Sequence, residues 1–368
     1  MSWDDWADHE AKLVHDAGRW RAPRDLDARG PTGTFEGRAV VSFASNDYLG
    51  LTQHPAVIAA AHDALDRWGT GAGSARLIVG SRPVHSRLEG ALADWKGTER
   101  AVLFSTGFAA NLGVIGALAD RDTLVCSDEL NHASIIDGRR LARAPLAVFR
   151  HRDATHVDDI LTSARGVRAL VVSETIFSMD GDAAPVDDLR EVCDRHGALL
   201  VLDEAHAVLG PSVASSDHVL RVGTLSKTLG ALGGFVAGPQ RFTDLLVNRA
   251  RSFIFTTAST PADAAAALAA IDVVRSAEGG ALRARLRAHV DRLRPGHPSP
   301  ILPYLCGSEQ RALDTAAALL DDDILVTAIR PPTVAPGTSR LRVTLSAAHT
   351  DDQVEHLARA LAAHLPQT

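Results

Sequence analysis

Lys227 is the residue whose type and position point most directly to chemistry. The chain contains three lysines, Lys12, Lys96 and Lys227, and arginine supplies every other basic position. A lysine amine can lose its proton and form a Schiff base when it is desolvated, whereas an arginine keeps its proton near neutral pH. Lys227 lies in the segment Gly223-Thr-Leu-Ser-Lys-Thr-Leu-Gly, directly after an apolar run. Taken alone, it fits a Schiff-base lysine and a surface lysine of a glycine-rich loop equally well.

Asp203 and His206 favour the Schiff base. They directly follow a second apolar run, and an acid and an imidazole at one strand end are typical of a functional site. With Lys227 they suit pyridoxal 5'-phosphate (PLP), because the lysine would carry the cofactor and the acid would keep its pyridine nitrogen protonated. A P-loop does not fit, because Ser226 and not a glycine precedes the lysine.

Two more polar positions follow apolar runs. Gly107 opens a predicted helix, where backbone N–H groups can bind a phosphate, although a plain strand-to-helix turn explains this glycine as well. His132 stands at the start of the next helix, where it either caps the helix or presents its ring to a flat ligand. Both residues therefore extend the candidate site without defining it.

The elements that must position these residues read as alternating strands and helices. The expected strands are continuous apolar runs, which indicates a mostly parallel α/β sheet with helices on both faces. Ligands of such sheets bind at the carboxyl ends of the strands, where the polar residues stand. The strands are expected at 101–104, 123–126, 169–172, 199–202, 219–222 and 234–237, with helices near 108–118, 131–142, 155–165 and 186–196.

A smaller α+β domain is expected after a proline-rich stretch that begins at Pro295. Its expected strands are 301–305, 325–329 and 341–345, and its helices are 308–321 and 351–364. We therefore predict three parts: an N-terminal helix and arm (1–45) that pack with the small domain, a large cofactor-binding domain (46–294), and the small domain (295–368).

Composition excludes several classes of protein. The 368 residues carry 38 Lys and Arg against 45 Asp and Glu, so there is no basic excess for binding nucleic acid. The cysteines, Cys126, Cys193 and Cys306, are scattered, which argues against a disulfide framework and a zinc site; no metal is expected. The acidic start does not resemble a secretory signal, and no apolar run reaches the roughly 18 residues of a membrane span. A cytoplasmic protein without a membrane partner is expected.

Several motifs, in order from about Trp3 to the C-terminus, resemble the α-oxoamine synthases. The resemblance implies homodimeric, PLP-dependent enzymes of the aspartate-aminotransferase fold (PLP fold type I), which condense an amino acid with an acyl thioester and release carbon dioxide. The motifs are Ser45-Asn-Asp-Tyr-Leu-Gly-Leu, Gly69-Thr-Gly-Ala-Gly-Ser-Ala-Arg, Leu130-Asn-His-Ala-Ser, Phe177-Ser-Met-Asp-Gly-Asp, Asp203-Glu-Ala-His and Thr224-Leu-Ser-Lys-Thr-Leu-Gly.

The C-terminal motif, which runs from Thr327 to Arg342, most resembles the members that join L-alanine to a pimeloyl thioester in biotin synthesis. The thioester would be carried on coenzyme A or on acyl carrier protein. A glycine-using, acetyl-transferring relative is the close alternative, since the stretch 130–138 resembles that enzyme too. A plain aminotransferase and a non-catalytic PLP-binding regulatory protein are the more distant alternatives.

The resemblance also implies roles for individual residues. Lys227 would carry the cofactor and abstract the α-proton of the amino acid, Asp203 would pair with the pyridine nitrogen, and His206 would hydrogen-bond the phenolic oxygen. The cofactor would also contact His132 (by stacking), Gly107, Phe108, Ser178 and Thr224. Thr256 or Thr257 would contact the phosphate bound by the partner subunit. The substrate would contact Arg19, His132, Thr333 and either Arg330 or Arg340. One departure from the family is a shortened loop after His206.

Overall fold

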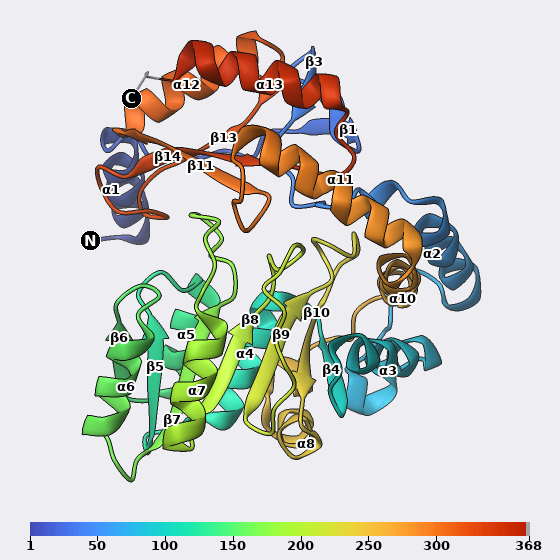
Figure 1. Ribbon diagram of the computed structural model, residues 1–368, viewed down its shortest axis with the longest axis vertical. Coiled ribbons are helices and arrows are strands. Elements are labelled where there is room, and N and C mark those ends of the chain that lie inside the picture. Colours follow the sequence, from blue (N-terminus) through green and yellow to red (C-terminus); the bar gives the residue numbers. More distant parts are fainter. Residues whose placement is uncertain (366–368) are drawn as a thin grey trace.

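The computed structural model describes residues 1–365, and its centre is a seven-stranded sheet (Figure 1). Only β10 runs antiparallel to its neighbours, and the other neighbouring pairs are parallel. The predicted α/β class with a mostly parallel sheet is therefore confirmed. In spatial order the strands are β4 (Arg100–Phe104), β10 (Gly234–Gly238), β9 (Val219–Thr224), β8 (Leu199–Asp203), β7 (Arg168–Glu174), β5 (Thr123–Asp128) and β6 (Leu146–Phe149).

Helices cover both faces of this sheet because its strands are apolar on both sides. In β4, for example, Val102 and Phe104 pack in the cluster that contains α4, while Ala101 and Leu103 pack in the cluster that contains α3 and α10. One face carries α4 (Gly107–Leu118), α5 (Ala133–Ala142), α8 (Gln240–Arg249) and α9 (Arg251–Ile254). The opposite face carries α3 (Pro83–Lys96), α6 (Ala154–Ser163), α7 (Val186–His196) and α10 (Pro261–Arg275), with α2 (Pro55–Trp68) packed on α10.

A second unit lies across the carboxyl-end side of the large sheet (Figure 1). Its three-stranded sheet has the order β11 (Ile301–Gly307), β14 (Ser339–Thr344) and β13 (Thr327–Ile329). A four-stranded sheet joins β1 (Leu26–Arg29), β2 (Thr32–Phe35) and β3 (Arg38–Ser42) to β12 (Ile324–Leu325). The helices of this unit are α11 (Ala277–Leu293), α12 (Glu309–Asp321) and α13 (Asp351–His364).

The predicted single strand at 325–329 is wrong. The segment forms two short strands on either side of buried Val326, because β12 pairs in parallel with β3 while β13 pairs with β14 in a different sheet. The β3–β12 pairing links the N-terminal arm to the C-terminal part of the chain. The division into three parts at residues 45 and 294 stays a prediction.

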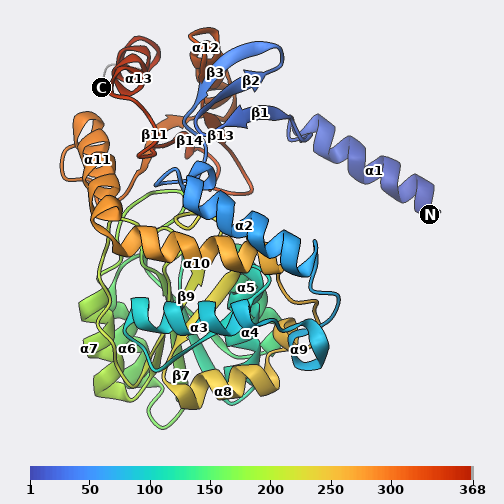
Figure 2. The same cartoon turned by 90° about the vertical axis from the view of Figure 1, so that its right-hand side faces the viewer.

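The N-terminal helix α1 (Trp3–Asp16) projects away from the rest of the molecule (Figure 2). Ser2 caps it and none of its residues is buried, although Trp3 and Trp6 are apolar. Over residues 1–365, no helix has the length and apolar character of a membrane span, and no group of three potential metal ligands occurs.

Candidate active site

The candidate site lies where β7, β8 and β9 end side by side. Glu174 and Asp203 are direct partners in the β7–β8 register, so their side chains share one face of the sheet. The turn after β8 carries His206, and the turn after β9 carries Lys227. The Lys227 Nζ lies 2.8 Å from His206 Nε2. The structure thus brings together the lysine, acid and imidazole that the sequence singled out.

Lys227 has a pKa below the usual value of its type. Burial is the largest cause, since it penalises the ammonium, while the nearby carboxylates of Asp203 and Glu174 act in the opposite direction. A lysine of lowered pKa supplies the free amine needed for Schiff-base formation and for proton abstraction. Burial therefore favours the free amine of Lys227, while the two acids favour its protonated form.

His206 is buried, and its pKa lies well below the usual value, because of burial and of the charges of Lys227 and Arg342. A neutral imidazole has one donor and one acceptor nitrogen. With Nε2 accepting from the Lys227 ammonium, Nδ1–H donates to the hydroxyl of Tyr48. The Tyr48 hydroxyl then donates to Asn46 Oδ1 at 3.1 Å, which also accepts from Arg342 Nη2 at 3.1 Å. This chain of hydrogen bonds sets the tautomer of His206 while Lys227 carries no cofactor.

Asp203 is held by two donors. Its carboxylate accepts from Asn111 Nδ2 at 2.7 Å and from the backbone N–H of Ala205 at 2.9 Å. Asn111 also donates to Ser134 Oγ at 2.9 Å, which ties α4 to α5. Since all three side chains are buried, the carboxylate has a fixed direction at the strand end. This is the environment that a protonated ring nitrogen requires of its counter-ion.

His132, at the start of α5, and Phe108, at the start of α4, lie next to each other. His132 is the N-cap of α5, and its Nδ1 accepts from the Ser134 backbone N–H at 3.3 Å. Its ring is exposed and meets Phe108 edge to face, with the ring centroids 6.2 Å apart. The helix-cap interpretation is thus confirmed, and the exposed ring fits the stacking on a flat ligand, which stays a prediction.

The start of α4 provides a cradle for a phosphate. Thr106 caps the helix, and a Cβ added at Gly107 would lie 3.3 Å from Cβ of Thr224. A side chain at this position would crowd Thr224, so glycine keeps the space between the helix N-terminus and the end of β9 open. Backbone N–H groups at a helix N-terminus bind anions, so this cradle fits the phosphate of PLP. Thr224 also bonds Ser226 through its hydroxyl at 2.7 Å.

The predicted substrate residues Arg19 and Thr333 lie in the small unit. Arg19 pairs with Glu309 at 3.0 Å, and Thr333 is exposed. Within residues 1–365, no hydrogen bond or ion pair joins either residue to Lys227 or His206. The structure therefore does not bring these two residues into the cluster.

The sequence left the choice between Arg330 and Arg340 open. Arg330 donates to the carbonyl of Gly18 at 3.0 Å, and Arg340 is paired with Asp180. Arg342, which the sequence reasoning did not single out, donates to the carbonyl of Ser178 at 2.6 Å and to Asn46. Of the three arginines, Arg342 is the one connected to the cluster around His206.

Glu174 is a further residue that the sequence reasoning did not assign. It is buried, and its Oε2 accepts from the Ser178 backbone N–H at 3.2 Å, whereas its Oε1 has no partner within residues 1–365. Burial and the neighbouring Asp203 raise its pKa well above the usual value. Glu174 therefore holds its proton more readily than an exposed glutamate does. The signal for it was its place in a polar segment directly after an apolar run.

The sheet order, the lysine after β9 and the phosphate cradle define a PLP enzyme of fold type I. The family model for aminotransferase class I and II matches residues 38–361. Similar solved structures include a serine palmitoyltransferase from S. paucimobilis with a bound PLP–myriocin aldimine (29% identity, TM-score 0.89, covering 98% of this chain and 96% of that one). Another is an 8-amino-7-oxononanoate synthase from Francisella tularensis (25% identity, TM-score 0.72, covering 88% and 96%).

Curated relatives narrow the assignment. The 8-amino-7-oxononanoate synthase of Anaeromyxobacter dehalogenans (strain 2CP-1) is 50% identical over 381 residues, which cover 98% of this chain and 96% of the relative. That of Methylobacterium sp. (strain 4-46) is 47% identical over 333 residues, covering 89% and 87%. The chain belongs to the class I and II aminotransferase family and, within it, to the 8-amino-7-oxononanoate synthases, PLP-dependent acyltransferases of biotin biosynthesis. The predicted family, fold, cofactor and enzyme class are confirmed.

Proposed function

We propose that this enzyme joins L-alanine to a pimeloyl thioester and forms 8-amino-7-oxononanoate, carbon dioxide and the free thiol. The observation that carries the proposal is the contact of the buried Lys227 amine with His206 at the strand end that also holds Asp203. In the net reaction the α-carbon of alanine forms a bond to the acyl carbon, the thiolate leaves, and the carboxyl group of alanine is lost as carbon dioxide.

Four residues carry the chemistry in this proposal. Bound PLP supplies the electron sink that makes the α-proton of alanine acidic. Lys227 holds the cofactor and takes the α-proton at its amine, and Asp203 keeps the ring nitrogen protonated. Once Lys227 carries the cofactor, Tyr48 would donate to Nδ1 of neutral His206, and the ring would donate through Nε2–H to the phenolic oxygen. His132 stacks on the ring face and lies beside the bound substrate.

The cofactor cavity would be completed by backbone and hydroxyl groups. The N–H groups of Gly107 and Phe108, at the start of α4, would bind the phosphate. Ser178, four residues after the end of β7, and Thr224, the last residue of β9, would add their hydroxyls. The close approach of Thr224 to Gly107 supports a phosphate at this position.

We assign the amino-acid carboxylate to Arg342 and not to Arg330 or Arg340. A planar guanidinium binds a carboxylate through two parallel hydrogen bonds, and Arg342 lies within the hydrogen-bonded chain that reaches His206. Arg340 is already paired with Asp180. Arg19 and Thr333 would contact the acyl substrate only if it extends toward the small unit, on coenzyme A or on acyl carrier protein.

We further propose a homodimer in the cytoplasm. The protruding helix α1 exposes Trp3 and Trp6, and the exposed segment Leu77–Val79 lies beside α9, which is followed by the exposed Phe255. A second copy would cover this apolar surface and bring Thr256 or Thr257 to the partner's phosphate. All three cysteines are buried and free, which suits a reducing compartment.

The deciding experiment measures carbon dioxide release with each pairing of alanine or glycine and pimeloyl or acetyl thioester. We expect the alanine–pimeloyl pair to be fastest. Lys227→Ala should abolish both the visible absorbance of the lysine-bound cofactor and turnover, whereas Lys12→Ala, at an exposed lysine of α1, should change neither. A preference for glycine with the acetyl thioester would refute the proposed substrates and favour the glycine-using relative.

A further inference from the structure

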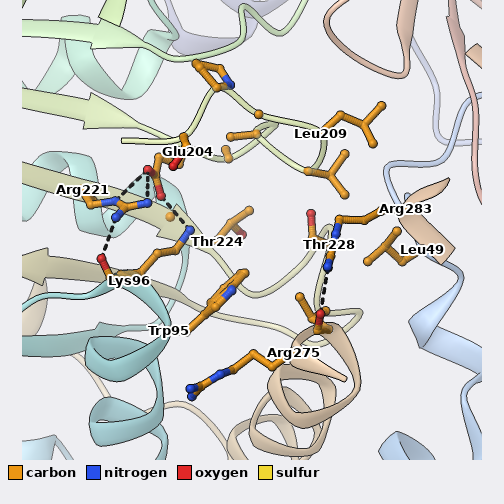
Figure 3. A pocket seen from close by; sticks show the side chains of 18 of the residues that line it. Leu49, Trp95, Lys96, Glu204, Leu209, Arg221, Thr224, Thr228, Arg275 and Arg283 are labelled. Atoms are coloured by element: carbon orange, nitrogen blue, oxygen red, sulfur yellow. Dashed lines mark hydrogen bonds and ion pairs between the residues drawn. The ribbon is translucent and has the colours of Figure 1, made fainter. Parts of the chain in front are cut away.

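A cavity of about 720 Å³ lies beside the candidate cofactor site, and Figure 3 shows side chains that line it. Its walls come from the end of α3, the shortened loop after His206, the end of β9, and the junction between α10 and α11. It shares Ala205 and Thr224 with the surroundings of the candidate site, yet none of His132, Asp203 and Lys227 lines it. Its volume falls within the range of small-molecule sites.

One side of the cavity carries a buried group of two cations and one anion. Lys96 Nζ lies 2.7 Å from Glu204 Oε2, and Arg221 Nη2 lies 2.7 Å from Glu204 Oε1. The carboxylate is thus shared, and the group keeps one surplus positive charge. Figure 3 shows Arg283 across the cavity from this group. Arg275 also lines the cavity and adds a further guanidinium. The electrostatics therefore select an anion.

Lys96 is the cation with donors to spare. An ammonium has three N–H donors, and within residues 1–365 the Lys96 ammonium has a single hydrogen-bond acceptor, Glu204. It also lies over the Trp95 ring, 4.1 Å from the centroid. Arg221, by contrast, donates to Glu204 and to the carbonyls of Lys96 and Val213. A buried cation that is only partly satisfied gains most from an anionic ligand.

The remaining walls are largely apolar. Leu49, Trp95, Leu209, Phe235 and Val274 line the cavity, so a ligand with a hydrocarbon body would bury apolar surface there. The ionic side keeps one surplus charge and most of the remaining walls are apolar, which suits a carboxylate with a hydrocarbon body better than inorganic phosphate; Arg275 and Arg283 add positive charge on the other side. We propose that this cavity is a second binding site, for a small organic carboxylate with an apolar body, separate from the cofactor and substrate site.

The test is calorimetric titration of the PLP-loaded enzyme with heptanoate and, in parallel, with inorganic phosphate and 1-heptanol at constant ionic strength. We expect one heptanoate per chain with a Kd of about 1 mM or tighter, and much weaker binding of the other two probes. The absorbance of the lysine-bound cofactor is recorded in each titration, because binding at the second site should leave it unchanged.

Variants of α11 locate the bound heptanoate. Ala284 and Arg283 line the cavity, so Ala284→Trp should fill it and Arg283→Gln should remove a charge, each weakening binding by about tenfold or more. Ala281→Trp and Arg285→Gln make the same changes on the same helix outside the lining, and should stay within about twofold of the unsubstituted enzyme. Both pairs are read alongside circular dichroism.

Three outcomes would overturn the proposal. Absence of heptanoate binding, or equal binding of phosphate or heptanol, would refute a carboxylate site. Equal effects of the lining and control variants would place the ligand elsewhere. Displacement of heptanoate by alanine, with a change in cofactor absorbance, would place it in the substrate site. Because none of these measurements uses turnover, the result is independent of the proposed substrates.

Discussion

Replacing Tyr48 by phenylalanine isolates the hydrogen bond that orients His206. The Tyr48 ring is fully buried, so the change removes the hydroxyl and leaves the packing of the ring intact. His206 Nδ1 then loses its partner in a buried position, whereas Asn46 Oδ1 keeps the hydrogen bond from Arg342. The structure thus predicts one unsatisfied buried donor as the main consequence.

The size of the effect follows from that single donor. A buried polar group left without its partner costs about 1–3 kcal/mol. The entropy of unfolding is about 2.1 cal/mol/K per residue, so 368 residues give roughly 0.8 kcal/mol per kelvin. Tyr48→Phe should therefore lower the melting temperature of the cofactor-free enzyme by about 1–4 °C.

Calorimetry and urea unfolding of cofactor-free protein measure this loss, and the chain supplies its own control. Tyr304 is the only other tyrosine, and within residues 1–365 its hydroxyl has no hydrogen bond, so Tyr304→Phe should change stability by less than about 0.5 kcal/mol. In a double-mutant cycle with His206→Leu, the Tyr48→Phe cost should largely disappear. Additive effects of the two substitutions, or a Tyr48→Phe effect no larger than that of the control, would refute the orienting role of Tyr48.

Three further changes test the electrostatics. The pKa of Glu174 is raised in the folded protein, so the cofactor-free enzyme should lose stability as pH rises above about 4.5, the pKa in the unfolded chain. Glu174→Gln should remove that loss. The same dependence of melting temperature on pH in both proteins from about pH 5 to 8 would contradict this prediction. Arg342→Lys should raise KM for alanine by about tenfold, since an ammonium cannot bind a carboxylate through two parallel bonds, whereas Arg340→Lys should leave KM within about twofold; equal effects in steady-state kinetics would reject Arg342. Glu204→Gln leaves two buried cations unpaired and should lower the free energy of unfolding in urea by about 3–5 kcal/mol. Lys96→Met leaves the neutral pair of Arg221 and Glu204 and should lower it by only about 1.5–3 kcal/mol. A larger loss for Lys96→Met than for Glu204→Gln would contradict the surplus charge.

The sequence predicted the large sheet because its central strands are buried on both faces and read as continuous apolar runs. The edge strand β6 was not predicted, since its residues Leu146 and Val148 are exposed and it has a neighbour on one side only. The N-terminal strands β1–β3 were read as an extended arm, because their short, mostly exposed sequences carry little apolar pattern. β1, β2 and β3 pair with one another through short turns, and only β3 also pairs with a distant segment, β12.

In the candidate site too, the residues at strand ends could be predicted from the sequence and those brought in by long-range contacts could not. Lys227, Asp203 and His206 directly follow strands, so the rule that ligands bind at the carboxyl ends of parallel strands was enough to group them. Tyr48 and Arg342 reach His206 from segments far away in the chain, and no local spacing announces such a contact. Tyr48 stood in a motif that the family resemblance had quoted, but only the fold shows what its hydroxyl binds.

The structure shows that two of the three lysines lie in polar clusters inside the protein. Lys12 is exposed on α1, whereas Lys96 and Lys227 are both held close to buried carboxylates or imidazoles. At Lys227 the amine is needed because it can lose its proton. At Lys96 the compact ammonium fits between the Trp95 ring and Glu204, while the broader guanidinium of Arg221 uses its donors on the opposite side of the same carboxylate. A chain that otherwise prefers arginine thus retains lysine at two largely buried positions for different physical reasons, and the second of these lines the cavity proposed as a second binding site.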